Sequence, residues 1–289
     1  MNVAVVTTLA VLQERDEAGR KENQRLKEAL ERQGAIVRCI AWDGPEQEWR
    51  DIEAMVIRTT WNYHLHANAF RAFIERRAAQ GCRCFNAARL MAWNIDKHYL
   101  QDLDAARVPI VPTHYLKQTA ALADFSLPTE WQAQPVVIKP TISASAHDTL
   151  RFDTGRQLLE SDELVSLHRQ HDLMVQPFQH HIAEGEVSLV AIAGELLHAV
   201  CKVPAKGEFR VQGAYGGEVI SHQITKEERE LVNAVMAALP EVPAYARIDV
   251  VKDNQARVAL MELELIEPQL FLDLFPQSAD ALARHVVGI

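Results

Sequence analysis

Cysteine is scarce in this chain, with only four residues in 289. Cys82 and Cys84 fall on one face of a short predicted strand, but no second pair follows to complete a zinc site. At this length and cysteine content a disulfide scaffold is also disfavoured. We therefore expect Cys39, Cys82, Cys84 and Cys201 to be reduced thiols in the core.

The sequence also lacks a long apolar run. Residues 3–6 are apolar, but no basic residue precedes them and no small-residue cleavage pattern follows, so they predict a first buried strand rather than a signal peptide. Nothing approaches the length of a membrane span. We expect a cytoplasmic protein without a membrane partner.

Clustered positive charge is missing as well. The formal net charge is -9, whereas binding to a phosphate backbone needs grouped Lys and Arg side chains. We therefore expect no nucleic-acid partner, although a local basic pocket for a small phosphate ligand is compatible with this charge. Small-molecule substrates are the expected partners, and a homodimer is compatible with the composition.

The glycine motifs of two common nucleotide folds are absent too. No G-x-G-x-x-G turn follows the first predicted strand, and no Walker A sequence occurs. A classical dinucleotide-binding domain and a P-loop domain would therefore both lack their phosphate cradle.

The first ninety residues alternate strand and helix patterns. Strands are expected at 2–8, 35–40, 54–58 and 82–85, and helices at 17–33 and 66–80. The first helix ends at Gly34, a residue type that favours the position after a helix. This order predicts an α/β domain with an open, mainly parallel sheet over residues 1–92.

The remaining residues, 93–289, show a mixed α+β pattern. Helices are expected near 94–106, 158–169 and 226–239, and residues 118–134 form an irregular polar connector. Strands are expected near 135–139, 149–153, 173–178, 186–193 and 196–203. An acidic hairpin follows the last predicted helix.

That hairpin carries the most informative pattern of the sequence. Side chains alternate faces along a strand, so Arg247 and Asp249 share one face, and Glu262 and Glu264 share a face of the returning strand. If those faces coincide, three carboxylates and a guanidinium converge. Oxygen ligands without His or Cys suit Mg²⁺ or Mn²⁺ rather than Zn²⁺. The alternative is an acidic, solvated face of an exposed hairpin.

Three further segments carry candidate ligand-binding groups. Lys139 ends an apolar strand immediately before a proline, where it either meets phosphate oxygens or extends its ammonium into water. Gln176 and Phe178 flank Pro177 at the end of another strand, which could line an adenine pocket. Glu186 opens the next strand, where its carboxylate could accept hydrogen bonds from ribose hydroxyls. A polar turn between two strands is the alternative for Glu186.

Residues 202–217 combine several cations with several glycines, which is too flexible and too charged for a core element. The segment is either a mobile surface loop or a cationic flap over an anionic intermediate. Arg210 is the best candidate in it for meeting a phosphoryl group, because its planar fork matches phosphate oxygens.

Together these motifs resemble the ATP-grasp superfamily. The resemblance rests on Asp96-Lys97, Ile138-Lys139-Pro140, Gln176-Pro177-Phe178, Glu186, Arg210 with Gly216-Gly217, Arg247-x-Asp249 and Glu262-x-Glu264 in this order. Within the superfamily the chain resembles glutathione-synthetase-like carboxylate–amine ligases. The amino-acid sequence of residues 58–63, 202–210 and 261–268 is similar to that of the cycloserine-forming (O-ureido-serine) cyclo-ligases. The likeness covers essentially the whole chain.

The resemblance implies a role for each matching residue. It implies two α+β subdomains that clamp ATP within residues 93–289, a small one at about 118–180 and a large one at about 181–289 together with 93–117. The implied nucleotide-binding residues are Lys97, Lys139, Gln176, Phe178, Glu186 and Lys202. The implied catalytic residues are Arg210 and Arg247, and the implied ligands of two Mg²⁺ ions are Asp249, Glu262 and Glu264. Two departures stand out: residues 143–147 replace a glycine-rich loop, and Glu264 stands where Asn is common.

The implied reaction is amide formation through an acyl phosphate, with release of ADP and phosphate. Arg58, Trp61 and Asn62 follow a strand end, where ligands of open sheets tend to bind, so they are candidate substrate residues. The sequence does not decide between joining two molecules and closing a ring. It identifies no general base, although His147, His180 and His181 are available. A nucleotide-binding sensor and a phosphotransferase acting on a hydroxyl remain alternatives.

Overall fold

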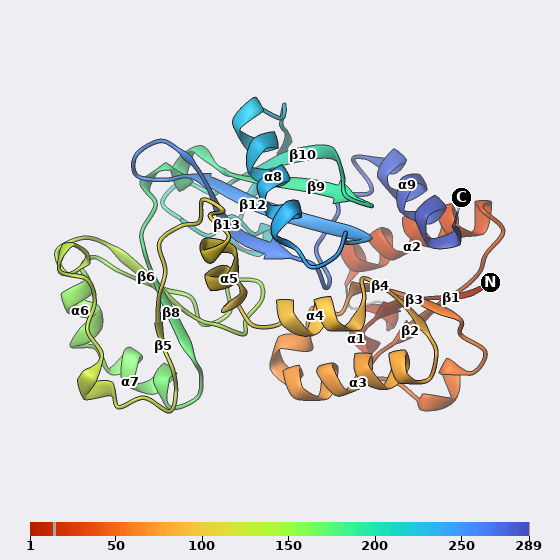
Figure 1. The fold of residues 1–289 in the computed structure, drawn as a ribbon, viewed down its shortest axis with the longest axis horizontal. Coiled ribbons are helices and arrows are strands. Elements are labelled where there is room, and N and C mark those ends of the chain that lie inside the picture. The colour runs from red at the N-terminus through yellow and green to blue at the C-terminus, as the bar shows by residue number, and fades with distance from the viewer. Residues whose placement is uncertain (14–15, 289) are drawn as a thin grey trace.

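The computed structural model describes residues 1–13 and 16–288 of the chain. An N-terminal sheet is followed by two antiparallel sheets, so the predicted mixture of a parallel α/β part and an α+β part is confirmed (Figure 1). None of the helices in the described residues is long and apolar enough to cross a bilayer.

The N-terminal sheet has the order β2-β1-β3-β4 and is parallel throughout. Its strands are β1 (Asn2–Thr7), β2 (Ile36–Ala41), β3 (Ala54–Thr59) and β4 (Arg83–Phe85). Val3 and Val5 pack in one buried cluster, whereas Ala4 and Val6 pack in another. Both faces are therefore covered, which explains why the first strand is apolar at every position.

Helices cover both faces of this sheet (Figure 1). The helices of this part are α1 (Leu9–Leu12), α2 (Glu17–Arg32), α3 (Ala67–Ala79) and α4 (Ala88–Asn94), with 3₁₀ turns at Glu46–Trp49 and Tyr63–His66. Asp16 caps α2 by accepting a hydrogen bond from Gly19 N at 2.9 Å. The helix ends before Gly34, whose φ of +82° suits glycine.

The second sheet is smaller and antiparallel, with the order β5-β8-β6-β7. Its strands are β5 (His114–Leu116), β6 (Val136–Pro140), β7 (Leu150–Phe152) and β8 (Leu173–Pro177). Helices α6 (Gly155–Leu159) and α7 (Asp162–His168) lie beside it in Figure 1, and short 3₁₀ turns occur at Leu122–Asp124 and Thr129–Trp131. The sheet and helices share their own buried cluster, centred on residues such as Val136, Leu164 and Val175.

The third sheet is antiparallel with the order β11-β10-β9-β12-β13. Its strands are β9 (Glu186–Ile192), β10 (Glu195–Val203), β11 (Glu218–Ser221), β12 (Tyr245–Lys252) and β13 (Val258–Glu264). Helices α5 (Tyr99–Ala105) and α8 (Lys226–Ala238) pack on one face through an apolar cluster that includes Ile248 and Val250. The remaining 3₁₀ turns are His180–Glu184 and Gly213–Tyr215.

The last helix, α9 (Pro276–Val287), was not predicted from the sequence. It packs beside α2 on the N-terminal sheet (Figure 1). Ion pairs join the two regions, one between Arg32 and Asp280 at 2.7 Å and one between Arg25 and Asp273 at 2.9 Å. The C-terminal segment thus returns to the N-terminal sheet.

Other differences concern shorter elements. The helix expected near 94–106 is the shorter helix α5, and α4, which precedes it, was not predicted. The single helix expected near 158–169 is two helices, α6 and α7. These two separate because Ser161 accepts a hydrogen bond from Leu164 N at 3.1 Å and so starts a new helix. Strands β5 and β11 were not predicted either.

Candidate active site

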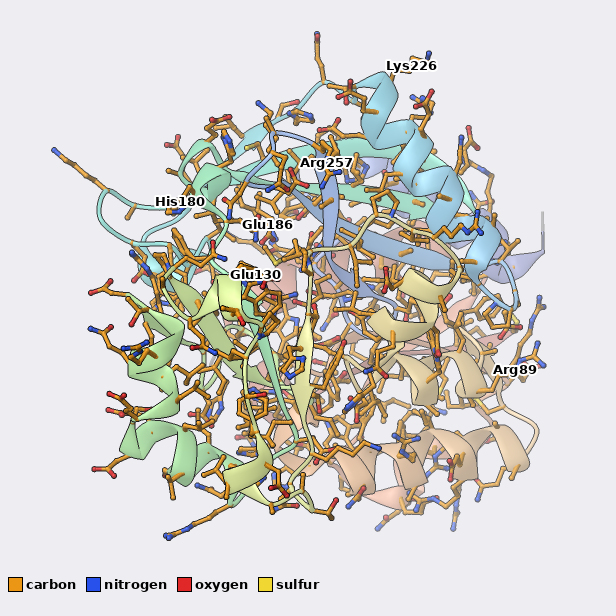
Figure 2. All side chains as sticks on the ribbon, turned by 60° about the vertical axis from the view of Figure 1, so that its left-hand side comes forward. Arg89, Glu130, His180, Glu186, Lys226 and Arg257 are labelled. Carbon is orange, nitrogen blue, oxygen red and sulfur yellow. The ribbon has the colours of Figure 1, made fainter. Side chains whose placement is uncertain are left out.

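A cavity of about 610 Å³ is lined by residues of the two antiparallel sheets and of segments that lie outside the strands. Glu186, labelled in Figure 2, lies in the interior between the small and large antiparallel sheets, whereas Lys226 and Arg89 lie at the periphery. Trp61 and Tyr63, which follow β3, line the cavity from the side of the N-terminal sheet.

The acidic hairpin contributes the polar side of this cavity. Strands β12 and β13 pair with Arg247 opposite Glu264 and Asp249 opposite Glu262, and a register shift follows Asp249. Opposite residues of an antiparallel pair point to the same face. The prediction that the two charged faces coincide is therefore confirmed, and the exposed-hairpin alternative is wrong, since Asp249 is 2% exposed.

Each hairpin carboxylate has a cationic partner. Lys97 Nζ lies 3.2 Å from Glu262 Oε1, and Lys202 Nζ lies 3.4 Å from Asp249 Oδ2. Arg247 is paired with both Asp249, at 2.9 Å, and Glu264. Within residues 1–13 and 16–288 no three acidic, His or Cys side chains are gathered closely enough to hold a metal by themselves.

These neighbours shift several pKa values. Burial alone would raise the pKa of Asp249, but Arg247 and Lys202 outweigh it and lower this pKa to about 2. Burial raises the pKa of Glu264 to about 7, against the effect of Arg247. Burial and then Glu264 raise the pKa of Glu267 to about 8. The site therefore contains acids of very different strength, a feature typical of active sites.

Lys139 and Lys202 extend from neighbouring sheets into the cavity. Lys202 Nζ lies 2.5 Å from Glu186 Oε1. Lys139 has no ion pair or side-chain hydrogen bond within the described part of the chain, and burial lowers its pKa. A half-buried ammonium without an ion pair of its own favours an anionic ligand, because a nearby negative charge offsets its loss of hydration.

The end of β8 forms the apolar side of the cavity. Gln176 donates a hydrogen bond from Nε2 to Thr113 Oγ1 at 2.9 Å. The Phe178 ring meets Phe209 edge-to-face with centroids 6.0 Å apart, and the Arg151 guanidinium lies 4.3 Å from its centroid. Aromatic and apolar surface beside polar groups suits a planar base.

The predicted flap closes another side of the cavity. Arg210 donates from Nε to Glu208 Oε1 at 3.1 Å and from Nη2 to Glu208 Oε2 at 2.6 Å. Its guanidinium lies 3.7 Å from the centroid of the Tyr215 ring. A Cβ on Gly217 would collide with the Val211 carbonyl, so the shape of this loop requires glycine there.

Comparison with known proteins agrees with this geometry. Residues 106–269 match the family model of the ATP-grasp domain of prokaryotic glutathione synthetase. The chain belongs to the ATP-grasp family. It is an ATP-dependent ligase that forms C–N bonds. Residues 3–86 match the model of the N-terminal domain of D-cycloserine synthetase DcsG.

Individual relatives of this ATP-grasp chain are distant in sequence. The cycloserine biosynthesis protein DcsG of Streptomyces lavendulae is 28% identical over 277 residues, which cover 90% of each chain. A glutathione synthetase of Parasynechococcus marenigrum is 28% identical over 193 residues, covering 65% of this chain and 59% of that protein.

Solved structures show the same ATP-grasp architecture. A crystal structure of D-cycloserine synthetase DcsG superimposes with a TM-score of 0.86 at 25% identity, covering 100% of this chain and 99% of the other. The ATP complex of D-alanine–D-alanine ligase from Bacillus anthracis has a TM-score of 0.73 at 13% identity, covering 100% and 96%. The latter likeness shows the fold alone.

Most residues singled out from the sequence line this one cavity. They are Trp61, Lys97, Lys139, Gln176, Phe178, Glu186, Lys202, Arg210, Arg247, Asp249, Glu262 and Glu264. Their individual roles remain predictions. The histidines considered as bases, His147, His180 and His181, are not among the lining residues.

Arg58 and Asn62 do not fit the expected substrate role in this structure. Arg58 is 0% exposed and donates from Nη2 to Glu22 Oε1 at 3.1 Å and to the Pro268 carbonyl. Asn62 accepts from Trp42 Nε1 at 2.8 Å and lies outside the cavity. Position after a strand end did not reveal that Arg58 points into the core, where an acid from α2 meets it.

Sequence reasoning also missed part of the lining. Tyr63, Tyr99, Glu267, Gln269 and Phe271 all border the cavity. The signal for the last three was present, because the alternation that starts at Glu262 and Glu264 resumes after one extra residue. A role was not assigned to them because they lie beyond the charged motif.

Proposed function

We propose that this ATP-grasp enzyme activates a carboxylate with the γ-phosphoryl group of ATP and joins the resulting acyl phosphate to an amine. ADP and phosphate are released and an amide forms. The observation that carries the proposal is the gathering of three lysines, two arginines and five carboxylates in one cavity between the antiparallel sheets. Positioning and neutralisation of charge are what phosphoryl transfer demands of a protein.

In this proposal the nucleotide lies between the two antiparallel sheets. Lys97, Lys139 and Lys202 face its phosphates, and the pairing of Lys202 with Glu186 links the phosphate end to the ribose end. Gln176 and Phe178 line the adenine, and Glu186 accepts hydrogen bonds from the ribose. The half-buried ammonium of Lys139, which has no ion pair of its own, supports a phosphate ligand, since an ATP oxygen would supply a close negative charge.

Asp249, Glu262 and Glu264 are the proposed metal ligands, for two Mg²⁺ ions, with Mn²⁺ as an alternative. The donor set fits, because all three offer oxygen atoms and Mg²⁺ normally needs only one or two carboxylates besides phosphates and water. A bound divalent ion would neutralise negative charge on the phosphate oxygens.

Two arginines act on the reacting groups in this proposal. Arg210 stabilises the acyl phosphate from the flap, which requires that it exchange its bidentate contact with Glu208 for phosphate oxygens. Arg247 stabilises negative charge in the transition state from β12. Both act electrostatically in a cavity that the flap shields from water, where such contacts are strongest.

We also propose the division into a substrate domain at 1–92 and an ATP-grasp domain at 93–289. The small subdomain covers about 118–180, and the large one covers about 181–289 with 93–117. The buried cluster of the small sheet, confined to residues 116–175, supports the small subdomain, whereas another buried cluster joins the N-terminal sheet to strands of the large sheet. The packing of α9 on α2 ties the end of the large subdomain to the substrate domain.

The proposed substrate is amino-acid-like. The relatives that support this are a cycloserine biosynthesis protein and a structure of D-cycloserine synthetase, each matched over at least 90% of this chain. The match of residues 3–86 to the N-terminal domain model of that synthetase favours a ring-closing reaction. Joining two amino-acid-like molecules is the alternative course.

ADP release tests the proposal. The enzyme is incubated with ATP, Mg²⁺ and a panel of amino acids, ureido amino acids and short peptides, and products are weighed by mass spectrometry. ADP together with an amide derived from two reactants supports intermolecular ligation, and a product derived from one reactant supports ring closure. ADP with a phosphorylated alcohol would make the enzyme a phosphotransferase, and tight Mg·ATP binding with no ADP from any carboxylate would favour a sensor.

A further inference from the structure

The segment after β13 forms one wall of the cavity. Glu267, Gln269 and Phe271 line the cavity, whereas the residues between them are buried. We call Glu267, Gln269 and Phe271 the acidic strip.

The backbone of the acidic strip is held by residues of the N-terminal part. Glu22 accepts hydrogen bonds from Leu270 N at 2.8 Å and from Leu272 N at 3.3 Å. Arg58 donates to the Pro268 carbonyl, and Trp61 Nε1 donates to the Glu267 carbonyl at 3.3 Å. The strip is therefore a fixed wall, a property that a substrate-positioning surface needs.

Glu267 is the acid of the cavity that has no ion pair of its own, although the nearby charges of Arg247 and Lys97 act to lower its pKa. Lys97 is committed to Glu262 and to the Ser143 carbonyl at 2.5 Å, and Arg247 is committed to Asp249 and Glu264. Glu267 is 6% exposed, and within residues 1–13 and 16–288 it forms no ion pair and accepts no side-chain hydrogen bond from another residue. A buried carboxylate in this position is costly without a positive partner.

The surroundings of Glu267 suit an organic cation. Glu267 lines the cavity together with Trp61 and Tyr63, and the Trp61 indole donates to its carbonyl at 3.3 Å. Aromatic faces attract ammonium groups, and a carboxylate accepts their hydrogen bonds. An ammonium bound here would also favour the ionised form of the glutamate.

We infer that Glu267 accepts the ammonium group of an amino-acid substrate and that Glu22 and Arg58 position it through the acidic strip. The inference rests on the proposed function, because it concerns the substrate of that same site. Glu267 thus selects amino acids over carboxylates that lack an amino group.

Paired substrates test this role. ADP release is measured with O-ureidoserine against 3-(ureidooxy)propionate and with alanine against propionate, in the wild type and in Glu267→Gln. We expect the wild type to prefer the amino member by about tenfold to a hundredfold in kcat/KM, the range for a hydrogen bond to a charged group. In Glu267→Gln this preference should fall to about twofold, with the KM for ATP unchanged. Glu195→Gln, a change at an exposed glutamate of β10, is the matched control.

The outcomes separate the inference from the proposed function. An unchanged preference in Glu267→Gln overturns the inference and leaves the ligase proposal standing. A raised KM for ATP with the preference retained also overturns it and indicates a metal ligand. Absence of ADP with every carboxylate overturns the proposed function and the inference with it. Calorimetry of alanine and propionate with the wild type, Mg²⁺ and a non-hydrolysable ATP analogue needs no variant, and equal affinities would overturn the inference.

Discussion

Replacing Arg58 with methionine distinguishes a buried structural arginine from a substrate ligand. The guanidinium is fully buried, lies 5.0 Å from the centroid of the Tyr245 ring and is paired with Glu22, which is itself 4% exposed. Arg58→Met would leave that carboxylate buried with only two backbone N–H partners. Breaking a buried pair in this way costs about 3–5 kcal/mol. For a protein of this size the melting temperature should fall by on the order of 10 °C.

The melting temperature is measured by scanning calorimetry, and ADP release is measured in parallel. Combining Glu22→Gln with Arg58→Met should recover part of the lost stability, because the uncompensated charge is then removed. The matched control is Arg89→Met, since the pair of Arg89 with Glu241 is exposed and should contribute about 0–1 kcal/mol. Arg58→Met with unchanged stability and abolished turnover would refute this reasoning and make Arg58 a substrate ligand.

Three further changes test the site and the core. Glu262→Gln should lower ADP formation by at least about a hundredfold, because it removes a proposed metal ligand; full activity would contradict the metal assignment. Arg210→Lys should lower kcat by about tenfold or more, since a point charge cannot replace the fork, and a pure loss of ATP affinity would show that the flap role is wrong. Burial lowers the pKa of His198 from 6.5 to about 4. Its contribution to stability is therefore complete above pH 6.5 and is lost as pH falls towards 4, by at most about 3 kcal/mol, so unfolding of His198→Gln should depend less on pH in this window.

Much of the local structure could be predicted from the sequence. Strand and helix patterns depend on periods of two and 3.6 residues, which are read directly from the chain. This is why the parallel N-terminal sheet and the pairing of the two charged strand faces of the hairpin were expected correctly. It is also why the division of a single predicted helix into two was missed, because Ser161 acts as a cap only in its local backbone geometry.

The candidate site was predictable where motifs follow one another in order. Lys139, Glu186 and Asp249 belong to different strands, and their order along the chain indicated one nucleotide site before any packing was known. The cavity contains all three. Spacing along strands determines which side chains share a face. The resemblance to the ATP-grasp superfamily supplied the expected role of each residue.

Only the tertiary structure decided which charges meet. Arg58 and Glu22 are 36 residues apart, and their contact with residues 268–272 spans more than 200. No local period encodes such contacts, because they depend on how the last segment returns to the N-terminal sheet. The sequence by itself thus determined the elements and the chemical groups of the site. The packing of three sheets decided that Arg58 serves the wall of the cavity and that Glu267 is left in it without an ion pair.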